Sequence, residues 1–350
     1  MNTDQNLTER EDLILQAVVH TFITDAEPVG SRSIVKRYSL DFSAATVRNV
    51  MSDLEEAGYL EQLHTSSGRV PTDSGYRYYV DHLMRVQKLT LQERARIEQD
   101  LSQQLSDADE VMRNTSQLLA LMSHHTGIVE MPDKEHALTR SIELLPIGES
   151  RAAMLISDSY GRVRTIIVTL ESAITREGLQ ELSRFLNDQL RGVSVDTLAS
   201  ALQNRSRALM EEHREVAARA MALLNMLPAD QPAQYFLEGA TQLFEQPEFH
   251  DVARAREVFT MLEDREILTE LLRNTLSASD SGKTSVVIGS ESQRPGMEAI
   301  SLVVAPYSVG EERVGMIGVI GPKRMPYSRL TAVVDYTANT LSRFLTRIAS

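Results

Sequence analysis

The sequence predicts an α+β protein of several domains, and three observations lead to this class. Near the N-terminus, helical periodicity gives way to a short strand-turn-strand pattern. At Gly127 a long helical stretch is replaced by short β-rich segments, and strands return from Ser285 after a second helical stretch. Since a chain of 350 residues has room for roughly two or three domains, we expect a separate N-terminal unit and one α+β domain that a helical insertion interrupts.

A helix that begins after Ser43 is the centre of the N-terminal unit. Ser43 is a favourable helix N-cap, and Gly58 has the position of a glycine that ends a helix. The apolar residues between them recur at i, i+3, i+4 and i+7: Val47, Val50, Met51 and Leu54. The opposite face carries small, neutral or basic side chains that are able to approach a phosphate or a base edge. These are Ala45, Thr46, Arg48, Asn49 and Ser52.

Two more helices precede this one. Thr8 and Glu11 form a capping box for a first helix that runs to about Thr24. Ser31 is expected to cap a short second helix, Arg32 to Tyr38, and a turn leads from it into the third. The second and third helices together predict a helix-turn-helix.

A hairpin follows the third helix. Tyr59 to Leu63 has the length and alternation of a strand, residues 65–68 form a turn, and Arg69 to Pro71 returns. His64 and Arg69 are expected near the tip of this hairpin. Three helices followed by a two-stranded wing predict a winged helix-turn-helix, which is a DNA-binding fold.

The same stretches resemble a known family. Three of them are similar to the N-terminal domain of the HrcA family of bacterial heat-inducible transcription repressors: EPVGSRSI (27–34), SAATVRNVMSDLEEAGYL (43–60) and HTSSGRVPTDSGYRYYVD (64–81). A fourth, GMIGVIGPKRMPYSRLTAVVDY (315–336), resembles the C-terminal signature of that family, so the similarity spans essentially the whole chain. The resemblance implies a winged-helix domain, a GAF-like domain and an inserted dimerising domain.

On this interpretation the third helix reads bases and its neighbours contact the DNA backbone. Arg48 and Asn49 are the expected base readers, because arginine pairs bidentately with guanine and asparagine with adenine. The complete set of predicted DNA contacts is Arg32, Ser33, Lys36, Ser43, Ala44, Thr46, Arg48, Asn49, His64, Ser66, Ser67, Gly68 and Arg69.

The charge of the chain does not favour non-specific binding to nucleic acid. The net charge is −13, and residues 1–90 contain nine Lys and Arg against thirteen Asp and Glu. Because bulk negative charge repels phosphates, DNA binding has to depend on local geometry. Five cations are expected around the recognition helix: Arg32, Lys36, Arg37, Arg48 and Arg69. We expect weak non-specific binding and a strong dependence on the sequence of the site.

Further helices connect this unit to the rest of the chain. A fourth helix, from Thr72 to about Arg85, contains Tyr76, Tyr78 and Tyr79, whose helical spacing favours core packing over a base-stacking platform. Two long helices are expected between Thr90 and residue 123, and their apolar stripe suits either a partner subunit or the next domain.

The remainder alternates between strands and helices. Strands are expected at 127–130, 141–147, 152–157, 162–170, 285–288, 299–305 and 314–320. Helices are expected at about 176–191, 198–225, 247–276 and 328–348. With the family's domains placed on this pattern, the expected partition is a winged-helix domain at 1–88, connecting helices at 89–123, a GAF-like domain at 124–192 and 282–350, and an inserted helical dimerisation domain at 193–281.

Other kinds of site are not expected. The chain has no cysteine, so disulfides and thiolate metal sites are excluded. His124 and His125 point apart on a helix, and with His136 they lack a metal-binding spacing. We find no nucleophile–base pair, and predict no enzyme activity, no metal and no cofactor.

No apolar run approaches the ~18 residues of a membrane span, and the polar start MNTDQNLTERED is not a signal peptide, so a cytoplasmic protein without a membrane partner is expected.

Two functions remain open, with an enzyme ranked last. The first is a homodimeric transcription repressor that binds double-stranded DNA at an inverted-repeat operator. By resemblance, that operator lies upstream of chaperone operons, and the chaperonin keeps the repressor active. The second is a winged-helix regulator whose GAF-like domain binds a metabolite near Gly318 to Pro322; thermal stabilisation by a small-molecule panel separates it from the first.

Overall fold

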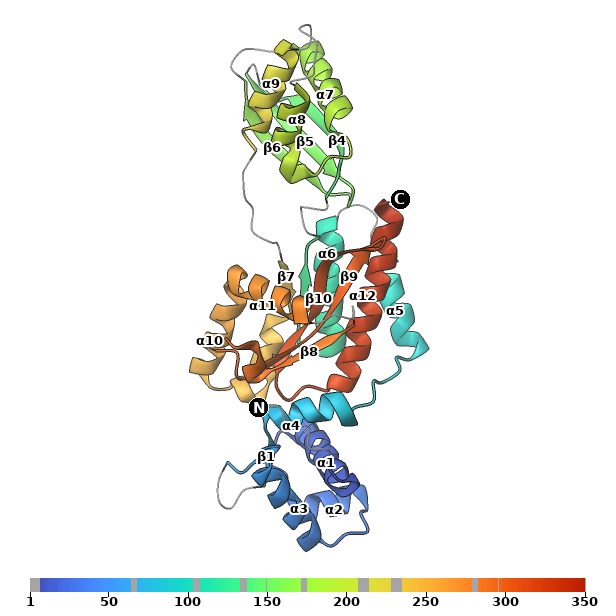
Figure 1. Cartoon of the computed structure of the whole chain (residues 1–350), viewed down its shortest axis with the longest axis vertical. Coiled ribbons are helices and arrows are strands. Elements are labelled where there is room, and N and C mark those ends of the chain that lie inside the picture. The colour runs from blue at the N-terminus through green and yellow to red at the C-terminus, as the bar shows by residue number, and fades with distance from the viewer. Residues whose placement is uncertain are drawn as a thin grey trace.

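The computed structural model describes residues 7–63, 68–102, 108–132, 137–148, 150–170, 175–206, 214–227, 235–278, 283–294 and 296–349. Helices and sheets occur in separate blocks along this chain, which confirms the α+β class. Three units follow one another along the long axis (Figure 1). A mainly helical N-terminal unit lies at one end, a five-stranded unit in the middle and a three-stranded unit at the other end.

The N-terminal unit packs three helices around a small core and adds a pair of short strands. Its elements are α1 (Glu9–Asp25), α2 (Ser31–Tyr38), α3 (Ala44–Glu56), β1 (Leu60–Glu61), β2 (Val70–Pro71) and α4 (Asp73–Tyr78), followed by one π-helical turn (Tyr79–Leu83). The antiparallel register of β1 and β2 pairs Leu60 with Pro71. Apolar side chains of all three helices meet in the core: Ile14, Leu15, Val18, Ile34, Val47 and Leu54.

Local chemistry explains most of the boundaries in this unit. The capping box of Thr8 and Glu11 is present, and the Ser43 side chain accepts a hydrogen bond at the start of α3. Gly58 follows α3 with a φ of 83°, a left-handed conformation that glycine adopts without strain. Ser31 is a correction, because it is the first helical residue of α2 and Gly30 is the N-cap. Tyr76 is buried as expected of a core tyrosine.

The middle unit is an antiparallel sheet with helices on both faces. The strand order is β7-β3-β10-β9-β8. The strands are β3 (Thr126–Glu130), β7 (Tyr235–Glu238), β8 (Ser285–Ile288), β9 (Ile300–Val309) and β10 (Glu312–Pro322). The helices α5 (Leu91–Ser102), α6 (Ala108–Ser123) and α12 (Tyr327–Ala349) lie on one side, and α10 (Val252–Glu263) and α11 (Arg265–Ala278) lie on the other (Figure 1).

Alternation along the central strands builds two separate cores. On β9, Val303 and Ala305 join the core shared with α6 and α12, whereas Leu302 and Val304 join the core shared with α10 and α11. Successive strand residues point to opposite faces, so a strand covered on both sides is apolar throughout. The connecting helix pair therefore packs on the five-stranded unit of its own chain, which is one of the two partners that the sequence allowed for it.

The three-stranded unit is inserted between β3 and β7. It contains β4 (Thr139–Pro146), β5 (Arg151–Asp158) and β6 (Val163–Thr169) in the order β4-β5-β6, with α7 (Arg176–Leu190), α8 (Leu198–Ser206) and α9 (Arg214–Leu224). The predicted hairpin turn joins β5 to β6, where Asp158 Oδ1 accepts from the backbone N–H of Tyr160 and Arg162. Glu130 at the end of β3 faces Tyr235 at the start of β7, so the insertion leaves and re-enters the sheet at adjacent positions.

The sheets divide the chain differently from the expected partition. The strands between residues 139 and 169 were expected to share a domain with 282–350. They form a separate sheet, and α7 packs against it. Conversely, residues 235–278, expected in the insertion, supply β7, α10 and α11 to the five-stranded unit. The inserted unit thus spans about residues 137–227. Strand periodicity shows that a strand exists but not which sheet it joins.

One long predicted helix is also divided. The stretch expected as one helix at 247–276 is broken at Asp264, whose carboxylate accepts from the backbone N–H of Glu266 and Ile267 and so caps α11. The stretch expected at 198–225 contains α8 and α9, and residues 207–213 lie outside the described part. Within the described ranges, no helix combines the length and apolar character needed to cross a membrane.

Candidate nucleic-acid interface

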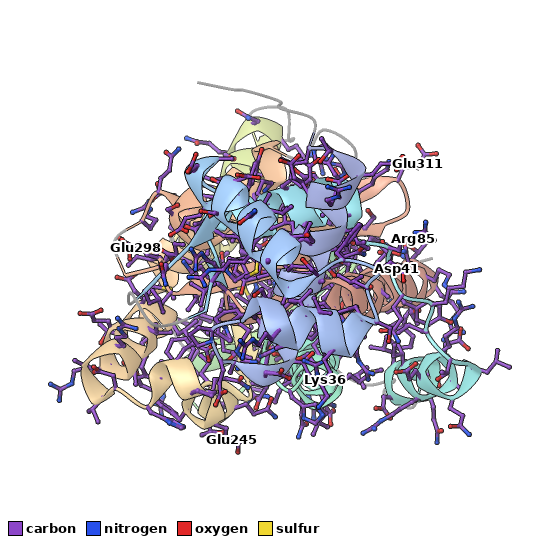
Figure 2. All side chains as sticks on the ribbon, turned by 90° about the horizontal axis from the view of Figure 1, so that it is seen from below. Lys36, Asp41, Arg85, Glu245, Glu298 and Glu311 are labelled. Carbon is purple, nitrogen blue, oxygen red and sulfur yellow. The ribbon has the colours of Figure 1, made fainter. Side chains whose placement is uncertain are left out.

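The exposed face of α2 and α3 carries the predicted contacts that are available to a ligand. Because α3 buries Val47, Val50, Met51 and Leu54, Arg48 and Asn49 are exposed on the outside. Arg32, Ser33 and Lys36 are exposed on α2. Figure 2 looks onto the N-terminal unit from its free end, with Lys36 on the side facing the viewer. Within the described residues, no hydrogen bond or ion pair occupies the side chains of Arg32, Lys36, Arg48 or Asn49.

The start of α3 is held by two of the predicted contacts themselves. Ser43 Oγ accepts from the backbone N–H of Thr46 at 3.1 Å and lies 2.9 Å from Thr46 Oγ1. Both residues therefore fix the helix terminus, and Ala44 between them is only half-exposed. The free N–H groups and the positive dipole end of this helix favour a phosphate nearby. Ser43 and Thr46 thus fix the start of α3, and Ser43 is exposed there.

Arg69 lies immediately before β2, on the side of the hairpin where the turn at 65–68 was expected. Its backbone N–H and C=O pair with Val29 at 2.9 Å each. Its guanidinium donates to Glu55 through Nε and NH2, both at 2.8 Å, and the side chain is 15% exposed. The sequence did not indicate Glu55 as this partner, because only the register of the hairpin brings the two residues together. Arg69 therefore ties the hairpin to α3, and its charge is already neutralised.

Gly68 also has a structural role. A Cβ at this position would lie 2.4 Å from the carbonyl oxygen of Val29, which is closer than any side chain tolerates. Gly68 therefore permits the bridge between residues 29 and 69. The other predicted contacts of the hairpin, His64, Ser66 and Ser67, lie outside the described residues.

The electrostatics of this end are local. Arg37 pairs with Asp25 at 2.6 Å, with both side chains about two-fifths exposed, so this pair contributes little to stability. Of the five cations expected around α3, two are thus paired with carboxylates, and Arg32, Lys36 and Arg48 have no partner within the described part of the chain. A surface of three available cations with an amide beside them suits specific contacts better than bulk attraction of phosphates.

The two adjacent histidines, His124 and His125, differ in exposure. His124 is exposed and His125 is buried, so the two side chains point apart as expected. No group of three potential ligands is found among the residues that the structure describes, and His136 lies outside them. Burial, reinforced by the nearby Arg324 guanidinium, lowers the pKa of His125 to about 4.

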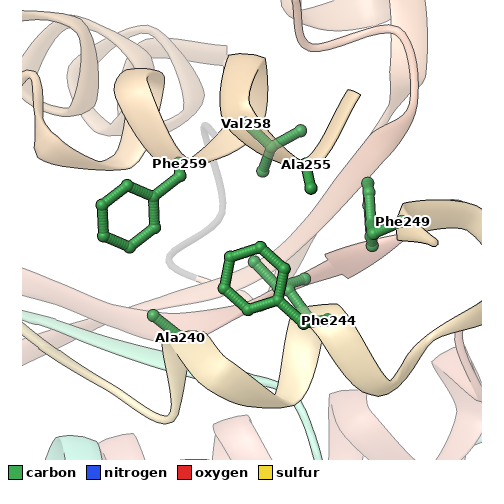
Figure 3. Close-up of a pocket in the computed structure, with 7 residues that line it drawn as sticks. Ala240, Phe244, Phe249, Ala255, Val258 and Phe259 are labelled. Atoms are coloured by element: carbon green, nitrogen blue, oxygen red, sulfur yellow. The ribbon is translucent and has the colours of Figure 1, made fainter. Parts of the chain in front are cut away.

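A small hollow beside the sheet offers no room for a metabolite. It lies between α10 and the 3₁₀ helix Ala240–Glu245 (Figure 3). Its volume is about 10 Å³, room for about one water molecule. The lining is entirely apolar: Ala240, Leu243, Phe244, Phe249, Ala255, Val258 and Phe259. The turn at Gly318 to Pro322, expected as a possible ligand loop, lies within strand β10, where these residues pair with Ile300 to Val304 of β9.

Comparison with protein families gives a match over most of the chain. The family described as "HrcA protein C terminal domain" matches residues 109–331. The "Heat-inducible transcription repressor HrcA" of Geobacter sulfurreducens is 39% identical over 340 residues, covering 97% of this chain and 98% of that protein. The repressor of the same description from Pelotomaculum thermopropionicum is 37% identical over 343 residues, covering 98% of each.

A solved structure shares the fold. A crystal structure described as that of a hypothetical protein at 2.2 Å resolution superposes with a TM-score of 0.68 at 23% identity. The alignment covers 98% of this chain and 100% of that chain, so the arrangement of elements extends from the N-terminal unit to α12.

The low pKa of His125 makes the stability of the fold depend on pH. Its pKa is about 4 in the fold and about 6.5 in the unfolded chain. Between these values the unfolded state binds the extra proton, so stability falls as pH falls from 6.5 to 4, by up to about 3 kcal/mol. We expect His125→Gln to show a shallower pH dependence of the free energy of unfolding, measured by chemical denaturation. His124→Gln, which alters the exposed neighbour, is the control; parallel curves for the parent and His125→Gln would contradict the prediction.

Proposed function

The chain belongs to the HrcA family of heat-inducible transcription repressors, and on that premise we propose that it is a homodimer that binds an inverted-repeat operator. The family is one of transcription repressors and not of enzymes.

The observation that carries the proposal is the exposure of Arg48 and Asn49, which have no partner among the described residues, on the outer face of a helix whose other face is buried. We propose that the N-terminal unit is a winged helix-turn-helix, that the five-stranded unit is GAF-like, and that the protein acts in the cytoplasm.

The proposed contacts fall into two groups, residues that contact base edges and residues that contact the DNA backbone or position the other contacts. Arg48 and Asn49 read base edges in the major groove. Arg32, Ser33 and Lys36 contact phosphates from α2, and Ser43, Ala44 and Thr46 bring the start of α3 to the DNA. Of the hairpin, His64, Ser66 and Ser67 are kept as proposed backbone contacts, and Gly68 and Arg69 hold the hairpin in place.

The operator proposal is tested by fluorescence anisotropy with a labelled inverted repeat from upstream of a chaperonin operon. Arg48→Ala and Asn49→Ala should each weaken binding by about 5- to 150-fold, because losing a bidentate base contact costs roughly 1–3 kcal/mol. Arg96→Ala removes an equal charge from the exposed surface of α5 and should leave the affinity unchanged.

A scrambled duplex measured at several salt concentrations is the second control. Equal affinity of the parent chain for the repeat and the scrambled duplex would rule out this operator.

We place the dimer surface on the open face of the three-stranded sheet. Its register brings Leu145, Ala153 and Ile167 side by side across the three strands. Four large apolar side chains on this face are exposed: Leu145 (47%), Ile147 (46%), Val163 (59%) and Ile167 (64%). An apolar patch of this kind typically marks an interface, and a face-to-face pair of sheets satisfies two-fold symmetry. The expected dimerisation domain at 193–281 is thus replaced by the inserted unit.

The dimer surface is tested by placing a charge in it. Ile167→Glu should shift the chain from dimer to monomer in analytical ultracentrifugation, because a carboxylate facing its symmetry copy is desolvated and repelled. Leu91→Glu, at an exposed apolar position on α5, is the matched control and should remain dimeric. Phe259→Glu tests the competing apolar patch beside α10, where Phe244 and Phe259 are about two-fifths exposed (Figure 3). Loss of the dimer only in Phe259→Glu would move the interface there.

We further propose that the chaperonin raises the fraction of operator-competent repressor. A shift of about 1.4 kcal/mol in this equilibrium changes the ratio of competent to incompetent protein tenfold. Adding chaperonin and ATP to the purified chain should raise the active fraction in a stoichiometric titration with operator, without changing the dissociation constant. A fully active preparation that stays active on heating without chaperonin would contradict this part.

A further inference from the structure

Several contacts join the N-terminal unit to the five-stranded unit, including the edge-to-face rings of Tyr76 and Tyr327 and hydrogen bonds of Arg85 and Gln87 with Ser328. Two sets of charged side chains stand out among them, and neither lies on the proposed DNA surface. In the first, α4 meets the 3₁₀ turn Gly289–Ser292 that follows β8. Asp73 Oδ1 accepts from Lys323 Nζ at 2.6 Å. Asp73 Oδ2 accepts from the backbone N–H of Ser290 at 2.9 Å and from its hydroxyl at 2.7 Å. One carboxylate on the N-terminal unit thus takes three hydrogen bonds from the other unit.

The turn is shaped to admit this carboxylate. Gly289 has a φ of 48°, and a Cβ there would lie 2.6 Å from Asp73 Oδ2, so a side chain at this position would collide with Asp73. Burial by itself raises the pKa of Asp73, but the hydrogen bonds from Lys323 and Ser290 outweigh it and hold the pKa below its ordinary value. The carboxylate is therefore charged at neutral pH, and its attraction to Lys323 persists.

Arg77, one helical turn further along α4, repeats the attachment. Its guanidinium donates in bidentate fashion to Glu291, from Nε at 2.8 Å and from NH2 at 2.6 Å, and NH2 also reaches the carbonyl oxygen of Val286. Glu291 is itself fixed, since its carboxylate accepts from the backbone N–H of Ile288. Bidentate pairs define direction as well as distance, so α4 is held in position and in rotation.

The second contact reaches a different helix. Arg324, whose side chain is 12% exposed, donates from NH1 to the carbonyl oxygen of Ile23 at 2.8 Å. This carbonyl belongs to the last turn of α1, where backbone acceptors lack intrahelical partners and a cation is favoured. The remaining nitrogens of Arg324 donate to Glu248 and Gln246 of the five-stranded unit. A single buried guanidinium therefore bridges the two units.

We infer that Asp73, Arg77, Lys323 and Arg324 form a clamp that fixes the direction in which α3 is presented to DNA. Both α1 and α4 belong to the core that holds α3, and the clamp grips each of them, which prevents rotation about either contact. The four residues are positioning residues: none touches DNA, but in a dimer they set the spacing and orientation of the two recognition helices. This role deepens the proposed function and rests on it.

The clamp should increase the affinity for the full inverted repeat but not the affinity for a single half-site. Two linked heads bind an inverted repeat with high avidity only when the linkage matches the geometry of the site. A head that rotates freely keeps its contacts with one half-site but loses part of the benefit of the second. Loosening the clamp is therefore expected to weaken binding to the full repeat selectively.

The test compares Lys323→Met and Asp73→Asn with the parent chain on a full inverted repeat and on a single half-site, by anisotropy at low salt. Each variant should bind the full repeat ~10-fold or more weakly, with half-site affinity within about twofold of the parent. Asp100→Asn, in an exposed ion pair on α5, is the matched control and should bind both duplexes as the parent does. Equal losses on both duplexes, or tighter binding to the full repeat, would overturn the positioning role.

A second measurement judges the clamp without DNA. Because the chain has no cysteine, Glu56→Cys and Glu311→Cys, at exposed sites on the two units, allow specific spin labelling of each. The distance distribution between the labels should be narrow in the parent background and broad with Lys323→Met. A distribution that stays narrow would overturn the clamp. If the parent fails to bind the repeat, the proposed function fails while this measurement still decides about the clamp.

Discussion

The antiparallel pairing of β3 with β7 is the interaction on which the plan of the molecule depends. It places Glu130 opposite Tyr235, so that the whole three-stranded unit is attached through two adjacent strand ends. Glu130 stabilises this attachment point, which we call the root of the insertion. Its carbonyl accepts from the Tyr307 hydroxyl at 2.6 Å, and its carboxylate accepts from the backbone N–H of Met316 at 3.1 Å. The strands before and after the insertion therefore belong to one five-stranded sheet, although they are far apart in the sequence.

A close helix–strand contact makes the connecting helices part of this sheet unit. A Cβ on Gly127 would lie 2.1 Å from the carbonyl oxygen of Ser116, so glycine alone lets β3 approach α6 this closely. Ser116 Oγ donates to the carbonyl oxygens of Gly127 and Phe236 and so joins α6 to two strands. These contacts fix α6 to two neighbouring strands of the five-stranded sheet.

Local chemistry was readable from the sequence, and distant pairing was not. The capping box at Thr8, the N-cap at Ser43, the glycine stop at Gly58 and the hairpin turn after Asp158 all rest on neighbouring residues, and all are present. The membership of each strand in a sheet depends on contacts between residues far apart in the chain, which periodicity does not encode. The four-residue strand β7 lay unrecognised in a stretch expected to be helical, and with it the place of the insertion.

The same limit applied to the candidate site. The outer face of α3 follows from its buried stripe, so Arg48 and Asn49 were placed on the exposed side from the sequence alone. The position of Arg69 depended on the hairpin register, which the sequence leaves undefined, and its pairing with Glu55 was therefore missed. Sequence patterns locate a side chain on an element, whereas its partners depend on how that element is paired.

Because few cations are available among the described residues of an acidic chain, we expect geometry to be the main source of affinity for the proposed operator. With Arg37 and Arg69 paired to carboxylates, each N-terminal unit offers little electrostatic attraction of its own. Two such units have to act together, yet the proposed dimer surface lies at the opposite end of the molecule (Figure 1). The orientation of the recognition helix is then transmitted through the root at Glu130 and the contacts of Lys323 and Arg324. We therefore expect a repressor built in this way to lose the proposed operator when either junction loosens, even while every proposed DNA-contacting side chain remains intact.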